Sequence, residues 1–98
     1  MKFTKNYNKL KNSSFTTIRK NTGYYKVGWI YDIMTPSSSF QAQVLSVTSI
    51  KKADIDDKLA MSDADMTRDE LIKTLKGWYG KDFDDFVLIK LARSKPND

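Results

Sequence analysis

The chain contains neither cysteine nor histidine. Without thiols and imidazoles it lacks disulfides, the usual zinc sites, a cysteine nucleophile and a histidine base. Glutamate occurs once, at Glu70, so any catalysis has to use Lys, Asp, Thr, Ser, Tyr or that residue. We expect no cofactor and no metal. Metal binding through aspartates alone is the less favoured alternative to a set of solvated surface acids.

Long hydrophobic runs are also missing, and the Lys/Asn-rich beginning of the chain has no apolar segment. We therefore expect no membrane span and no signal peptide, and a soluble, cytoplasmic monomer. The 98 residues, 40% of them hydrophobic and 12% aromatic, suffice for one domain with a single core. We expect that core to span about residues 10–92 and the tail 93–98 to be mobile.

Acidic residues are scarce in the first half of the chain. Residues 1–53 contain nine Lys or Arg and the single acid Asp32, a net charge of +8, whereas residues 54–98 carry a net charge of −3. A domain polarised in this way has one surface suited to phosphates. A Lys-rich solubilising surface would explain the total charge but not its segregation. Only three of the seventeen cations are Arg. This disfavours a surface that recognises many phosphates or guanines through the paired hydrogen bonds that Arg forms.

Alternating apolar and polar residues predict strands, and the first 14 residues have Phe3, Tyr7 and Leu10 at helical spacing. The residues predicted to form strands are 15–19, 26–35, 40–50 and 86–92. In the second of these, Val27, Trp29, Tyr31 and Ile33 share one side, so Trp29 is expected in the core, and Gly28 marks a bulge or a close backbone approach. The third switches its apolar face between Val44 and Leu45, as a bent strand in a small barrel does.

Two helices are predicted in the second half. Residues 54–61 form a short helical turn capped by Asp54, followed by an acidic loop over 62–66. Thr67 and Glu70 then form a capping box, so Glu70 is a cap and not a catalyst, and Gly80 ends that helix.

The stretch from Phe15 to Trp29 combines hydroxyls, cations and aromatics ahead of a strand. A Thr-x-Arg element entering a Lys-Val-Gly turn, then a long strand, an acidic loop, one capped helix and a final strand, resembles the ASCH domain of the PUA-like superfamily. The resemblance covers roughly residues 10–92. It implies an α+β fold, a small PUA-like β-barrel with one well-capped helix and short accessory helices.

The favoured function is an RNA- or nucleotide-binding module with a polar, basic cleft. Threonine hydroxyls would orient a base or ribose, Arg19 would hold a phosphate, Tyr24 or Tyr25 would stack on a base, and further lysines would supply charge at the rim. The residues predicted to bind are Thr16, Thr17, Arg19, Lys20, Tyr24, Tyr25, Lys26, Lys51 and Lys52. For the threonines and Arg19 the alternative is that Thr simply suits a strand and that Arg19 pairs with an acid such as Asp65.

Two further functions stay open. Some members of the resembled family hydrolyse acetylated cytidine nucleosides with a Lys, a Thr and a Glu. Here Thr17 matches the Thr, but the Lys and Glu positions fall on Ser14 and near Ala64. An enzyme of this kind would have to use Lys11 and either Asp63 or Asp65. The other alternative is a protein-interaction module whose acidic segment, residues 54–69, contacts a basic partner.

Overall fold

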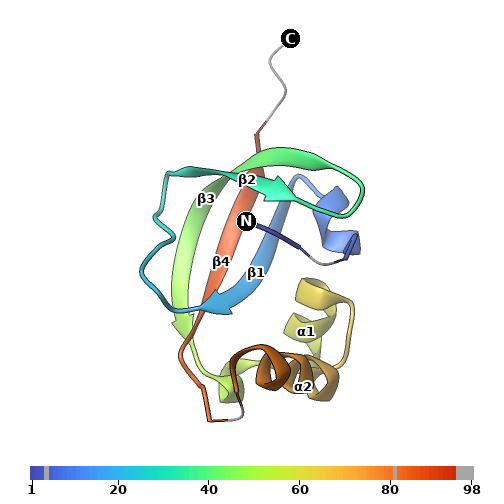
Figure 1. The fold of residues 1–98 in the computed structure, drawn as a ribbon, viewed down its shortest axis with the longest axis vertical. Coiled ribbons are helices and arrows are strands. Elements are labelled where there is room, and N and C mark those ends of the chain that lie inside the picture. Colours follow the sequence, from blue (N-terminus) through green and yellow to red (C-terminus); the bar gives the residue numbers. More distant parts are fainter. Residues whose placement is uncertain (4, 81, 95–98) are drawn as a thin grey trace.

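Four strands form one antiparallel sheet in the computed structural model, which describes residues 1–3, 5–80 and 82–94 (Figure 1). The strands are β1 (Ser14–Lys20), β2 (Ile30–Met34), β3 (Ser39–Ile50) and β4 (Phe86–Arg93). The helices are the 3₁₀ turns η1 (Asn8–Lys11) and η2 (Lys52–Asp54), then α1 (Asp57–Ala64) and α2 (Arg68–Tyr79). In the sheet the strands follow the order β1-β4-β3-β2, so the last strand of the chain lies at the centre.

β4 is central because it is apolar on both faces. Val87, Ile89 and Leu91 are buried on one face and Phe86 on the other. A strand of this kind has to be covered on both sides, as is usual for near-continuous apolar runs. The N-terminal segment contributes to that cover with Phe3. The core therefore begins well before residue 10.

β3 bends at a β-bulge between Val44 and Ser46, where the inserted residue Leu45 has no partner in the register. The predicted switch of the apolar face between Val44 and Leu45 is wrong, because the bulge leaves Leu45 exposed and resets the alternation. After the bulge, Val47 pairs with Ile89 and returns to the face that Val44 occupies opposite Leu91. A bulge of this kind increases the local twist and curvature of the sheet.

The α+β class is confirmed, but the described residues form an open sheet with β1 and β2 at its edges, not a closed barrel. β2 crosses the other strands at the end of the sheet opposite α2 (Figure 1). The N-terminal segment lies between the two edges. Lys2 forms a parallel bridge with Met34 of β2, and its carbonyl accepts a hydrogen bond from Arg19 of β1 at 3.0 Å. The two edge strands are thus linked through three N-terminal residues, not by a ladder.

α2 has the predicted capping box. The Glu70 amide donates to the Thr67 hydroxyl at 3.3 Å, the Thr67 amide donates to the Glu70 carboxylate at 3.4 Å, and Gly80 follows the last turn. Leu71 and Leu75 form the buried face of this helix. The assignment of Glu70 as a cap is confirmed.

α1 has the predicted length of eight residues, but it begins and ends three residues later than predicted. Its cap is Asp56, which accepts the Leu59 amide at 2.8 Å, whereas Asp54 accepts the Lys51 amide in the preceding turn. Residues 62–64, predicted as part of an acidic loop, form the last turn of α1, and Asp63 is buried there. The helix ends at Asp65 because this residue adopts a left-handed conformation with φ of 58°.

β2 is shorter than the predicted strand over residues 26–35. Gly28 has φ of 89°, which interrupts the alternation of sides ahead of Ile30. Tyr31 and Ile33 are buried as expected, but Val27 and Trp29 are exposed. The prediction of Trp29 as a core residue is wrong.

Among the described residues, no helix is long and apolar enough to cross a membrane. The predicted mobile tail includes Arg93 and Ser94, whose amides donate to Ser13 and Gln41. Residues 95–98 lie outside the described residues.

Candidate functional site: a pocket with a buried ion pair

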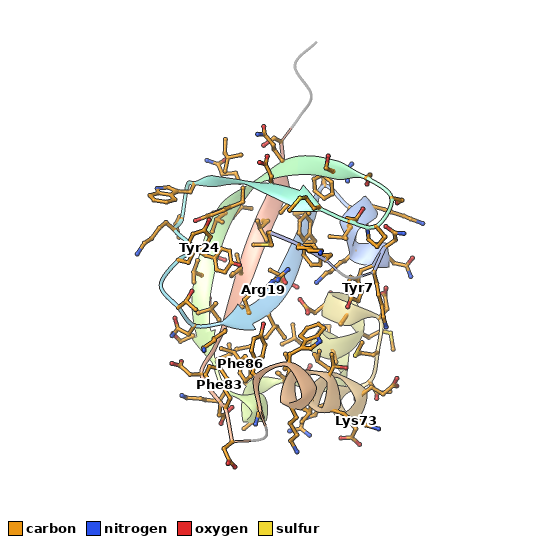
Figure 2. The ribbon with its side chains drawn as sticks, in the orientation of Figure 1. Tyr7, Arg19, Tyr24, Lys73, Phe83 and Phe86 are labelled. Carbon is orange, nitrogen blue, oxygen red and sulfur yellow. The ribbon has the colours of Figure 1, made fainter. Side chains whose placement is uncertain are left out.

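A pocket of about 210 Å³ lies between β1, the N-terminal segment, the end of α1 and the face of α2. Its polar and charged lining includes Lys2, Lys9, Thr17, Arg19 and Asp63, and its aromatic lining Phe3, Tyr7, Trp78 and Tyr79. Figure 2 shows Arg19 on β1, with Tyr7 on the side of the molecule where η1 and α1 lie. Three elements distant in sequence thus meet at one concave site.

Lys9 and Asp63 form an ion pair at 3.3 Å inside this pocket, and both residues are almost fully buried, with 7% and 4% exposure. Asp63 reaches this position because the last turn of α1 packs against β1 through Ala60 and Ala64. Thr16 donates its hydroxyl to Asp63 Oδ1 at 3.0 Å. Thr16, predicted to bind ligand, therefore orients the carboxylate.

Burial opposes the charge on both partners. It raises the pKa of Asp63, against the opposite effects of Lys9 and Thr16, and it lowers the pKa of Lys9, against the effect of Asp63. A buried pair of this kind costs desolvation that its mutual attraction repays only with good hydrogen bonding. Its presence is therefore weak evidence for stability alone.

The Lys9 ammonium is fully engaged. It donates to the Thr16 carbonyl at 2.6 Å, contacts Asp63, and lies 5.2 and 5.3 Å from the ring centroids of Phe3 and Tyr7. An ammonium has three N–H groups, and the carbonyl, the carboxylate and the two aromatic faces account for them. In this geometry Lys9 holds Asp63 in place and is not a free amine.

Asp63 keeps one oxygen for a ligand. Thr16 and Lys9 both approach Oδ1, and no described residue donates to Oδ2. No buried side-chain oxygen or nitrogen of the described residues lacks a partner, so Oδ2 is reached by solvent. Asp63 also lines the pocket, and its Oδ2 is a hydrogen-bond acceptor that no described residue uses.

Arg19 supplies the positive side of the site. Its Nε donates to the Thr17 hydroxyl at 3.2 Å, and its guanidinium stacks 4.8 Å from the Phe3 ring centroid. With the bond to the Lys2 carbonyl, two of its five N–H groups are used. The alternative pairing of Arg19 with Asp65 does not occur, because Asp65 accepts the Asn8 amide at 2.9 Å.

The structure brings Thr17, Arg19 and Asp63 together, with Thr16 directly behind Asp63. The other predicted residues lie outside the pocket lining, and these are Lys11, Lys20, Tyr24, Tyr25, Lys26, Lys51, Lys52 and Asp65. Lys11 lines a second, more open hollow. Lys20 lies over the Phe83 ring at 5.2 Å. The predicted cleft is therefore smaller and less basic than expected.

The acidic segment is used internally. Asp54 and Asp56 accept backbone amides at the starts of η2 and α1, Asp57 accepts the Arg68 amide at 2.8 Å, and Asp63 is buried. Of these four acids only Asp63 is buried, and Asp54, Asp56 and Asp57 stay exposed.

Lys9, Trp78 and Tyr79 were not predicted as site residues. Trp78 and Tyr79 end α2, where Trp78 is half exposed and both residues line the pocket. No pattern marks Lys9, because a lysine in a Lys/Asn-rich segment is indistinguishable from a surface lysine until α1 packs beside it.

Among the described residues, no three acidic side chains gather closely enough to hold a metal ion. No protein-family model matches the chain, and no curated protein or solved structure shows significant similarity to it. The resemblance to the ASCH domain therefore rests on the short motif and the order of elements.

Proposed function

We propose that this domain binds a nucleotide-like ligand, with the base in the pocket and the phosphate at Arg19. The observation that carries the proposal is Asp63, which lines a pocket with aromatic walls and keeps one carboxylate oxygen without a partner among the described residues. Carboxylates accept hydrogen bonds from the amino groups of bases, and aromatic side chains stack on base faces. This combination suits a flat, amino-bearing ring.

The size of the pocket supports the same ligand. At about 210 Å³ it lies below the range of roughly 300–1,000 Å³ typical of pockets that hold a whole drug-sized molecule. A single base fits such a volume, while the sugar and the phosphate remain at the mouth. Arg19 lies there with unused N–H groups, and the first half of the chain contains the single acid Asp32.

We also propose that the fold is related to the PUA-like barrel that the resemblance implies. In a PUA-like barrel the sheet closes on itself, and here the N-terminal segment joins Met34 to Arg19 across the gap between the edge strands. We propose that this link takes the place of the strand pairing that closes a barrel. The pocket lies next to it, because Lys2 and Arg19 line the pocket.

Replacing Arg19 by alanine tests the phosphate position. We expect the affinity for cytidine 5′-monophosphate to fall about 10- to 100-fold, the loss of one or two charge-assisted hydrogen bonds. The affinity for cytidine should change much less, because it lacks the phosphate. Chemical-shift titration of the labelled protein measures both, with thermal unfolding to verify the fold.

Lys73→Ala on the exposed side of α2 is the matched control for loss of one positive charge. Equal losses in the two variants would show that the charge acts nonspecifically. Shifts absent from Thr17, Arg19 and Asp63 would contradict the pocket itself.

Hydrolysis of acetylated cytidine is the second candidate, because Thr17, Asp63 and a lysine do share one pocket. The lysines of the pocket are Lys2 and Lys9, however, and not Lys11. An amide hydrolase needs an activated nucleophile and a proton donor, and Lys9 would have to leave Thr16 and Asp63 to supply either. Acetate released from acetylated cytidine, and abolished by Thr17→Val, would establish the enzyme. Binding without acetate release would exclude it.

A further inference from the structure

A row of aromatic rings lies on the loop between β1 and β2 and continues into β2. Tyr25 lies close enough to Arg19 and Tyr79 for both to influence its pKa, which burial raises. The rings of Tyr24 and Tyr25 are 5.1 Å apart, and Trp29 continues the row through Tyr31, whose ring is 5.6 Å from Tyr24 and 6.5 Å from Trp29. In the view of Figure 2, Arg19 lies between Tyr24 and Tyr7.

The outer rings are open to solvent. Tyr24 is 62% exposed and Trp29 is 59% exposed, whereas Tyr31 beneath them is buried. Large aromatic side chains usually bury most of their surface on folding. Two neighbouring ones left exposed and supported by a third form a surface that suits stacking.

The backbone holds this surface in place. The Tyr31 hydroxyl donates to the Tyr24 carbonyl at 3.0 Å and accepts the Lys26 amide at 3.2 Å. The Gly28 amide donates to the Val44 carbonyl at 2.8 Å with φ of 89°, which turns the chain so that Trp29 faces outward. The rings are therefore positioned before any partner arrives.

Charge selects the kind of partner. Lys26 lies in the same loop, and Arg19 and Lys20 lie on the strand that precedes it. Asp32 is the single acid of the first 53 residues, and it is engaged with the Gln41 amide at 3.2 Å. Asp85 contacts Asn21 at the start of the loop, at 3.1 Å. Aromatic rings interleaved with cations suit an anionic chain of flat rings.

We propose that the natural ligand is a single-stranded nucleic acid, one base of which enters the pocket while its neighbours stack on Tyr24 and Trp29. This inference rests on the proposed function, because the pocket anchors the strand. The pocket volume supports it, since a base held there leaves its backbone outside, and Arg19 of the pocket lining stands on the strand that leads into the loop of Tyr24. Stacking tolerates any base, so sequence preference would come from the pocket alone.

The experiment compares ligand lengths. Affinities of the full chain for cytidine 5′-monophosphate and for di-, tetra- and octanucleotides of cytidine, as RNA and as DNA, are measured at one moderate salt concentration. We expect affinity to rise with length up to the tetranucleotide. Tyr24→Ala and Trp29→Ala should each lower the tetranucleotide affinity about 5- to 100-fold, the range of one base stack, and leave the mononucleotide unchanged.

Leu45→Ala is the control, because Leu45 is an exposed apolar residue at the β3 bulge. It should leave every affinity unchanged. A mononucleotide that binds while longer strands bind no better would overturn this inference and keep the pocket. Failure of all lengths to bind would overturn both. Equal affinities for RNA and DNA of the same length would indicate that the protein contacts only bases and phosphates. A much higher affinity for RNA would indicate that it also contacts the 2′-hydroxyl.

Discussion

Phe86→Ala is expected to lower the free energy of unfolding by about 3–5 kcal/mol, the usual cost of removing a buried phenyl ring. Phe86 is fully buried at the start of the central strand. Its ring lies 5.2 Å from that of Phe83 and 5.8 Å from that of Tyr79. The ring thus joins the sheet to the end of α2. Because small domains have only about 5–15 kcal/mol in total, this loss is a large fraction of the stability.

Denaturant unfolding measures the effect, and an unchanged dependence on denaturant concentration would show that the two-state comparison is valid. Leu88→Ala, two residues along the same face of β4, is the control, because Leu88 is only half-buried. Leu88→Ala should lower the free energy of unfolding clearly less than Phe86→Ala does. Equal losses at the two positions would contradict the view that the sheet and α2 are joined mainly through Phe86.

The sequence predicts the elements where local chemistry decides them. The capping box of Thr67 and Glu70 marks the start of α2 because both groups lie within one turn. The short, almost continuous apolar run around Ile89 marks β4, as is typical of a strand buried on both faces. These signals need no knowledge of the rest of the fold.

Prediction from the sequence fails where contacts between residues far apart in the chain decide the local structure. Gly28 shifts the phase of the residues ahead of β2, so Trp29 leaves the side that simple alternation assigns to it. Asp63 resembles a loop acid in sequence, yet it becomes the buried partner of Lys9 once α1 packs against β1. Of the site, the sequence nominates Thr17, Arg19 and Asp63 as separate possibilities, and only the packing joins them.

Removing either member of the Lys9–Asp63 pair is expected to cost about 3–5 kcal/mol of unfolding free energy, because the remaining charge is left buried without its partner. Lys9→Met and Asp63→Leu are the single variants. The double variant should be as stable as the natural chain or more stable, since apolar residues of similar volume need no desolvation. A double-mutant cycle measures the coupling. A double variant whose cost equals the sum of the two single costs would show that the two charges are not coupled.

The pKa shifts give this prediction a pH dependence. Burial raises the pKa of Asp63 above its ordinary value of 3.8, so the folded chain keeps a proton there that the unfolded chain has lost. The stabilising effect of that proton is fully present below the ordinary pKa and is lost as the pH rises through the raised pKa. Relative to the double variant, the natural chain should therefore gain stability as the pH falls from neutral into this window. A difference independent of pH would contradict the raised pKa.

The same double variant separates structure from function at the pocket. Evolution of a buried ion pair needs a reason other than stability when apolar residues would serve equally well. If that reason is the free oxygen of Asp63, the double variant folds but loses cytidine binding, because the leucine offers no acceptor to the amino group of the base. Uridine carries a carbonyl oxygen where cytidine carries the amino group, so it should bind the natural chain more weakly than cytidine. The double variant should not lose affinity for uridine as it does for cytidine. A folded double variant that still prefers cytidine to uridine would assign the pair to the architecture of the pocket alone.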